Sequence, residues 1–124
     1  MLGIGRSLAL CSASLLLVAA GDPGRGYDVV VRQASTCVLC HAGPFPNPHL
    51  QGTIGPDLHG VGARLTADEI RVRLVDARSV VPGTVMPSFG LVGGGARVGA
   101  AWQGRPILEA QEIEDAVAYL AGLK

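Results

Sequence analysis

Hydrophobic positions along the chain fall into three segments that have the spacing of helices. In the first segment, Tyr27, Val30, Val31 and Ala34 recur at intervals of three and four residues. This spacing predicts a helix that ends near Cys37. The run of three valines at 29–31 would favour a strand by propensity alone.

The second segment begins with a capping signal. Thr66 is followed three residues later by Glu69, so the Thr66 hydroxyl and the Glu69 carboxylate can each satisfy a free amide of the first helical turn. Apolar residues then recur on one face at Ile70, Leu74 and Val75. These features predict a helix over 67–79, which Pro82 and Gly83 would end.

The third segment, residues 109–123, has the clearest helical pattern of the chain. Acidic residues cluster near its start, where they suit the helix dipole. One face is apolar, through Ile113, Ala116, Val117, Leu120 and Leu123. Two long loops rich in Gly and Pro, over 43–62 and 80–108, connect the three predicted helices. The chain is therefore predicted to form an all-α domain.

The N-terminal residues have the pattern of an export signal. Arg6 precedes an uncharged stretch over 8–20 that ends in small residues, and Gly21 is the expected new N-terminus. A membrane anchor is the competing interpretation, but the apolar run of about 13 residues is shorter than the ~20 that a spanning helix needs. We expect residues 1–20 to be a signal peptide and 21–124 to form one exported, periplasmic domain without a stable membrane span.

After loss of Cys11 with the signal, the chain keeps two cysteines, within Cys37-Val38-Leu39-Cys40-His41. This is the attachment pattern of c-type haem, in which both thiols form thioethers and the histidine binds the iron. Half of a zinc site is an alternative, although His49 and His59 lie at spacings unlike those of common zinc modules. A thioredoxin-like dithiol is another, but that motif follows a strand.

Composition and charge agree with a bound haem. Aromatic residues make up only 4% of the chain, so a protein core would lack large apolar groups that a haem could supply. The ten basic and ten acidic residues balance, which gives no indication of binding to nucleic acid or to an anionic membrane surface.

Met86 is the expected second axial ligand of the iron. It is the only methionine of the exported chain, lies in the loop before the last helix and precedes Pro87. His49 and His59 are alternatives. Ligation by His41 and Met86 should raise the reduction potential and leave no vacant iron site, which favours electron transfer over catalysis.

Several other residues have expected roles around this centre. A proline carbonyl in Ile54-Gly55-Pro56-Asp57-Leu58 can accept a proton from His41 and fix its tautomer. Arg64 either pairs with a haem propionate or is solvated. Tyr119 is a candidate for packing against the first helix, and Phe89 and Trp102 for packing on the haem.

The motifs together resemble class I c-type cytochromes. CVLCH is followed by IGPDL, a methionine loop and an amphipathic C-terminal helix. That resemblance implies three to four helices and long loops wrapped around one covalent haem c. Within the class, TVMPSFG (84–90), RV (97–98) and GRPILEAQEIEDAVAYLAGLK (104–124) resemble the SoxX family, and the similarity extends from about residue 33 to the C-terminus.

The SoxX resemblance implies a partner and a pathway. SoxX is the monohaem subunit of the periplasmic SoxAX heterodimer, which joins thiosulfate oxidatively to a cysteine of the carrier protein SoxYZ. The catalytic haem belongs to SoxA, and SoxX, not catalytic alone, passes electrons to a downstream cytochrome c. By position, Cys37 and Cys40 hold the haem, and His41 and Met86 bind its iron. Glu109 departs from the Ser or Thr expected as the helix cap.

Two other functions remain open at the level of sequence. One is a free-standing class I cytochrome that shuttles electrons, and residues 104–124 argue for the SoxX family over it. The other is a thiol module without haem, either a disulfide oxidoreductase or a small zinc-binding domain.

Overall fold

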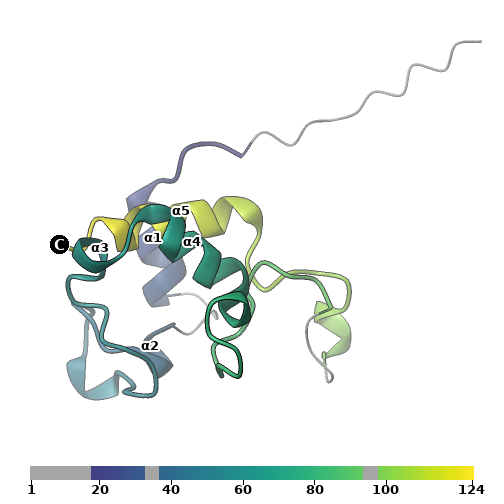
Figure 1. Cartoon of the computed structure of the whole chain (residues 1–124), viewed down its shortest axis with the longest axis horizontal. Helices are drawn as coiled ribbons and strands as arrows, with labels where there is room; N and C mark the ends of the chain where they lie inside the picture. The colour runs from purple at the N-terminus through teal and green to yellow at the C-terminus, as the bar shows by residue number, and fades with distance from the viewer. Residues whose placement is uncertain (1–17, 33–36, 94–97) are drawn as a thin grey trace, which may run out of the picture.

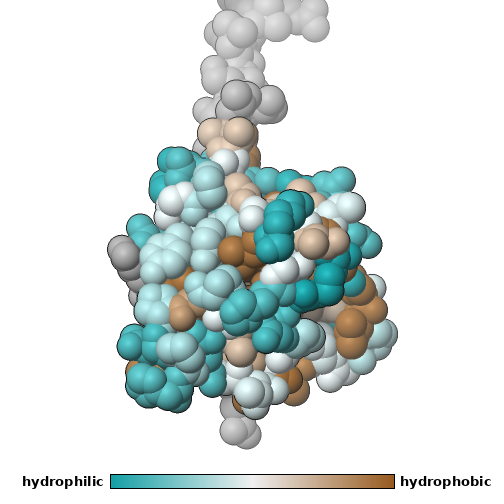
Figure 2. Space-filling view, turned by 90° about the vertical axis from the view of Figure 1, so that its left-hand side faces the viewer, coloured by the Kyte–Doolittle hydropathy of each residue, from teal (hydrophilic) through white to brown (hydrophobic). Residues whose placement is uncertain are grey.

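The computed structural model describes residues 18–32, 37–93 and 98–124 (Figure 1 and Figure 2). Most of the predicted signal peptide, and Ala34 of the first apolar stripe, lie outside these residues. The described part contains helices, turns and loops and no β-strand. The all-α prediction is confirmed.

Helices of very different lengths make up the described part of the chain. Two are long: α4 (Ala67–Asp76), extended by a 3-10 turn (Ala77–Ser79), and α5 (Ala110–Ala121). Three are about one turn long: α1 (Pro23–Tyr27), α2 (Cys37–Cys40) and α3 (Val61–Arg64). A π-helical turn (Asp28–Arg32) prolongs α1, and single 3-10 turns occur in the loops at Pro48–Leu50 and Ala100–Trp102.

The first helix begins earlier than the apolar spacing indicates. Asp22 lies at its N-cap and accepts a hydrogen bond from the Arg25 amide, while Pro23 occupies the first turn. The valines then continue as a helical turn rather than as a strand, with Val29 and Val30 buried. Packing against the rest of the domain therefore overrides the strand propensity of this run.

The two other predicted helices are confirmed with their caps. Thr66 and Glu69 form the expected capping box at α4. At α5, Glu109 takes the N-cap position, and its amide donates to the Glu112 carboxylate over 2.8 Å. The start of the helix is therefore still capped, although Glu109 replaces the expected Ser or Thr.

Helix α1 crosses α5 at very short range, which places the two ends of the domain together (Figure 1). A Cβ atom added to Gly26 would lie 1.9 Å from the carbonyl oxygen of Asp115, and one added to Gly21 would lie 2.1 Å from that of Glu114. Beside this crossing, the rings of Tyr27 and Tyr119 pack edge to face with centroids 5.6 Å apart. The predicted contact of Tyr119 with the first helix is confirmed.

The hydrophobic core lies between α1, α4 and α5. Its α5 contribution is the apolar face that the sequence predicts, and Leu123 borders it. Arg71 of α4 forms an ion pair with Glu114 of α5 at the edge of this core, with Nε 2.6 Å from Oε1. The buried hydrophobic residues are Val29, Val30, Phe45, Val61, Ile70, Leu74, Ala77, Phe89, Leu108, Ile113, Ala116, Val117 and Leu120.

Asp115 is the one charged residue buried among those described, with 3% of its surface exposed. Its carboxylate accepts two hydrogen bonds from Arg25, of 2.7 and 2.9 Å. The Asp22 amide and the Gln111 side chain donate to it as well. These donors, Arg25 first among them, lower the pKa of Asp115 to about 2.

A long excursion of the chain separates α4 from α5. The Leu108 amide donates to the Phe89 carbonyl over 2.9 Å, which joins the two backbones where they leave the body of the domain. Residues 91–93 and 98–107, together called the arm below, extend away from the helices and carry the 3-10 turn Ala100–Trp102 (Figure 1). Among the described residues, no helix has the length and apolar character to cross a membrane.

The Asp115 network predicts an acid-sensitive fold. Because its pKa is lower in the folded chain than in the unfolded chain, the carboxylate stabilises the fold above about pH 4, and this stabilisation disappears as the pH falls towards 2. We expect Asp115→Asn to lower the free energy of unfolding at pH 7 by about 2 kcal/mol and to flatten its dependence on pH below 4.

Urea unfolding of the mature protein, followed by circular dichroism at several pH values, measures both effects. Asp68→Asn is the matched control, because Asp68 is exposed and meets Arg71 at the surface. The control should stay within about 0.5 kcal/mol of the wild type. Equal losses for the two variants would contradict a special role for the buried carboxylate.

Candidate functional site

Helix α2 brings the motif residues together on one turn. Cys37 and Cys40 are its first and last residues, and both are half-buried. The His41 amide donates to the Cys37 carbonyl over 2.9 Å and so continues the turn by one residue. Two thiols and an imidazole therefore project from five consecutive residues of nearly helical backbone.

The imidazole of His41 is oriented by the loop that follows. Its Nδ1 lies 2.7 Å from the carbonyl oxygen of Pro56. A carbonyl only accepts hydrogen bonds, so Nδ1 carries the proton of this contact, and in the neutral ring Nε2 then has the lone pair. The predicted proline contact is confirmed, and it leaves Nε2 available to bind a metal.

Two glycines allow the loop to lie directly on α2 and on the imidazole. A Cβ atom added to Gly55 would lie 2.4–2.8 Å from atoms of the His41 ring, and one added to Gly52 would lie 1.9 Å from the Leu39 carbonyl oxygen. The two glycine amides also donate to α2, from Gly52 to Val38 over 2.8 Å and from Gly55 to Cys40 over 2.6 Å. The imidazole is thus fixed by a surface that only glycine can provide.

Gln51 holds the first half of this loop in place. Its side-chain oxygen accepts from the Gly43 amide, and its nitrogen donates to the Phe45 carbonyl, both over 2.9 Å. Phe45 is buried in the core. The density of Gly and Pro over 43–62 was the only signal in the sequence for this arrangement, and it did not single out Gln51 or the two glycines.

Arg64 forms hydrogen bonds to the turn after Pro56. It donates to the carbonyls of Asp57, over 2.6 Å, and of His59. Asp57 in turn accepts from the amide and the ring of His59, and the amide is the first cause that lowers the pKa of the Asp57 carboxyl. Arg64 therefore supports the segment that presents the Pro56 carbonyl to His41, and His59 lies exposed on that turn.

Met86 lies in the loop after α4 and is half-buried. Its amide donates to the Thr84 hydroxyl over 3.2 Å, and Ser88 ties the same loop to Asp76. Both Met86 and Cys37 pack against the hydrophobic core, so the methionine loop and the motif helix border the same cluster. His49 is exposed on its 3-10 turn.

The two aromatic residues expected near the site have different positions. Phe89 is buried in the core. Trp102 is 46% exposed on the arm, where the Arg105 guanidinium lies 5.8 Å from the centre of its ring.

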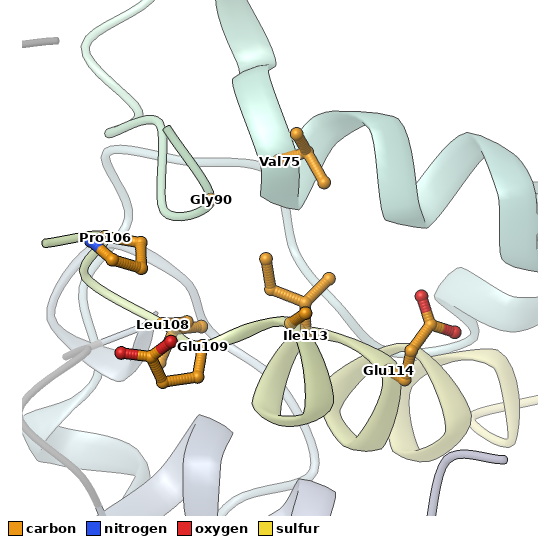
Figure 3. A pocket seen from close by; sticks show the side chains of 8 residues that line it. Val75, Gly90, Pro106, Leu108, Glu109, Ile113 and Glu114 are labelled. Atoms are coloured by element: carbon orange, nitrogen blue, oxygen red, sulfur yellow. The ribbon is translucent and has the colours of Figure 1, made fainter. Parts of the chain in front are cut away.

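A hollow of about 300 Å³ lies at the base of the arm between α4 and α5 (Figure 3). Val75 and Ile113 face each other across it, and Gly90 and Pro106 lie where the arm begins. Glu114 at its edge is already paired with Arg71. The predicted site residues do not line this hollow.

The structure gives the zinc alternative no support. Over the part of the chain that is described, no three or more His, Cys, Asp or Glu side chains come together in a way that could hold a metal ion. The arrangement at α2 instead suits a cofactor that forms bonds to two thiols and one imidazole.

The features above are those of a class I c-type cytochrome: helices only, a CVLCH turn near the start, and an imidazole held by a proline carbonyl. Comparison with solved structures finds a crystal structure of SoxXA from P. pantotrophus, with a TM-score of 0.76 and 39% sequence identity. The match covers 86% of this chain and 84% of that chain. Comparisons with protein-family models and with curated proteins gave no match.

Identity at this level over most of both chains shows the family. The chain belongs to the SoxX family of cytochromes.

The glycine contact with His41 predicts a sensitive position. Gly55→Ala would place a methyl group against the imidazole, so we expect the ring to lose its contact with Pro56 and the protein to lose about 1–3 kcal/mol of stability. Urea unfolding measures the loss, and the proton NMR signal of the His41 ring N–H measures the contact. Gly99→Ala is the control, since its Cβ would meet open space. An unchanged His41 signal in Gly55→Ala would contradict the proposed packing.

Proposed function

We propose that the chain is the monohaem electron-transfer subunit of a periplasmic SoxAX-type complex that acts in thiosulfate oxidation. The observation that carries the proposal is the geometry at α2, where two cysteines share one turn with an imidazole whose Nδ1 is held by Pro56. The similarity to the SoxXA structure supports the choice of complex.

The residues present fit a covalent haem c. Cys37 and Cys40 would form thioethers with its vinyl groups, His41 would bind the iron through Nε2, and Met86 would complete the axial pair. The bound haem supplies a one-electron couple. The protein's part is to fix the ligands. Gly55 and Pro56 orient the imidazole, and two hydrogen bonds, from the Met86 amide to Thr84 and from Ser88 to Asp76, hold the methionine loop.

The partner of this subunit is proposed to be SoxA, as in the complex named for the similar structure. Joining thiosulfate to a thiol of the carrier SoxYZ forms a sulfur–sulfur bond and releases two electrons and one proton. Catalysis belongs to the SoxA haem in this scheme. The present chain accepts the electrons one at a time and passes them to a downstream cytochrome c, and it is not catalytic alone.

Export is part of the proposal. Residues 1–20 are proposed to be removed as a signal peptide, because haem attachment of this type in bacteria takes place outside the cytoplasmic membrane. Cleavage before Gly21 would remove Ala19, whose backbone pairs with the Gln111 side chain, and keep the Asp22 amide that donates to Asp115. N-terminal sequencing of the exported protein tests the cleavage site.

Haem attachment is tested by the reduced pyridine-haemochrome spectrum of protein exported in a host with c-type maturation. We expect the band of two thioethers for the wild type and the shifted band of one thioether, or no haem, for Cys40→Ser. Cys11→Ser is the control and should match the wild type, since Cys11 leaves with the signal. A two-thioether band in Cys40→Ser, or a colourless wild type, would contradict the proposal.

The axial assignment is tested by Met86→Ala. The haem should stay attached, but its reduction potential should fall by on the order of 0.1 V or more, within the roughly 0.8 V that axial ligands span, and added imidazole should bind the iron. His49→Ala and His59→Ala are the controls and should change neither property. If a histidine variant opened the iron while Met86→Ala did not, the assignment would be wrong.

The place in a complex is tested by co-purification with the SoxA subunit of the same organism. A stable pair supports the SoxAX role. A haem-loaded protein that fails to bind SoxA would instead be a free-standing class I electron shuttle.

A further inference from the structure

Exposed hydrophobic side chains are rare on the two long helices, α4 and α5, and lie mostly elsewhere. Apart from Val18 and Val72, the exposed large hydrophobic residues of the described chain come from three segments, which are α2 with the loop after it, the loop before Met86 and the arm. They are Leu39, Leu50 and Ile54 around the cysteine motif, Val80, Val81 and Val85 before Met86, and Leu91, Val92, Trp102 and Ile107 of the arm.

These three segments project to the same side of the molecule. In Figure 1, α2, the loop before Met86 and the arm all lie below α4 and α5. Apolar groups held on one side of a small soluble domain indicate an interaction surface.

The first two segments have a reason to be apolar within the proposed function. They carry His41 and Met86, so side chains such as Leu39 and Val85 would border the haem. The arm has no such reason, because it leaves the body beyond the Phe89–Leu108 pair and extends away from α2. Its exposed residues need another partner.

The charge of this region indicates what kind of partner. Arg105 is the one charged residue of the arm, whereas residues 109–115 alone include four acidic ones. On the arm itself, Arg105 lies over the exposed Trp102. An aromatic ring with a stacked arginine is a typical centre of a protein interface, where Trp and Arg are both enriched.

We propose that the arm is a docking element for the SoxA-type subunit, with Trp102 as its central contact and Arg105 facing acidic groups of the partner. The inference rests on the proposed function and adds a contact beyond the haem edge. Because the arm lies on the same side as the haem-ligand loops, one partner can engage both at once. The arm would then hold the partner while electrons pass at the haem.

The test measures the affinity of the haem-loaded mature protein for the SoxA subunit of the same organism. We expect Trp102→Ala to weaken binding by about thirtyfold or more, the effect of losing a central interface residue. Val72→Ala removes an exposed hydrophobic side chain from α4 and should bind like the wild type. The haem spectrum, reduction potential and melting temperature of Trp102→Ala should be unchanged.

The charge part of the proposal is tested by salt. Arg105→Gln should slow association at low ionic strength and reduce its dependence on salt, because a charge at an interface mainly steers the encounter. Arg73→Gln on α4 is the control and should keep the wild-type dependence. Equal salt dependence of Arg105→Gln and the wild type would overturn the acidic-partner part of the proposal.

Three further outcomes would overturn the docking role. Trp102→Ala that binds SoxA like the wild type would remove Trp102 from the interface. Ultracentrifugation showing that Trp102→Ala abolishes self-association, with SoxA binding intact, would assign the arm to a second copy of this chain. A wild type that carries haem but does not bind SoxA would refute the proposed complex itself, which distinguishes that failure from a failure of the arm.

Discussion

The close crossing of α1 over α5 is the constraint on which the domain depends. Helix axes can approach this closely only where side chains are missing, and Gly21 and Gly26 meet the backbone carbonyls of α5 without a Cβ atom. The approach also buries the Asp115 carboxylate. Hydrogen bonds from Arg25 and from the Asp22 amide offset the cost of removing this charge from water. The crossing and the ion pair thus require each other. Together they fix α1 against α5.

The loop after α2 also uses glycines for close backbone packing, here at the site. Gly52 and Gly55 let backbone pack on backbone and on the His41 ring, while Gln51 and Arg64 supply the hydrogen bonds that a sheet or helix would otherwise provide. A segment of about twenty residues with little regular structure can therefore be well defined. The orientation of one imidazole is set by contacts that are mostly main chain, so it depends little on side-chain packing.

The sequence predicted the parts of the structure that have a periodic signal. The apolar stripe of α5, the capping box of α4 and the contact between Tyr119 and the first helix are all present. The motif also placed two cysteines and His41 on one turn with a proline carbonyl nearby. The start of α1 was missed because its signal, Asp22 followed by Pro23, is short and lies before the apolar stripe.

The remaining differences come from residues whose role has no pattern in sequence. In a sequence, a glycine that is required for close packing cannot be told from one that allows a flexible turn. Gly52 and Gly55 therefore could not be singled out among the glycines of this loop. Arg64 offered two surface roles, and its observed partners are backbone carbonyls that only the folded turn presents. Trp102 was expected to pack on the haem, and the exposed position that it takes could not be foreseen because the arm has no helical or strand period.

The position of Trp102 also makes this protein optically simple. The chain contains one tryptophan, so the intrinsic indole emission originates from a single place on the arm. In the proposed haem-loaded state, quenching by the porphyrin would depend on the distance between the arm and the ligand loops. The wavelength of that emission would depend on how much water surrounds the ring. The native protein thus carries a reporter of arm position that requires no label and leaves the cysteines untouched.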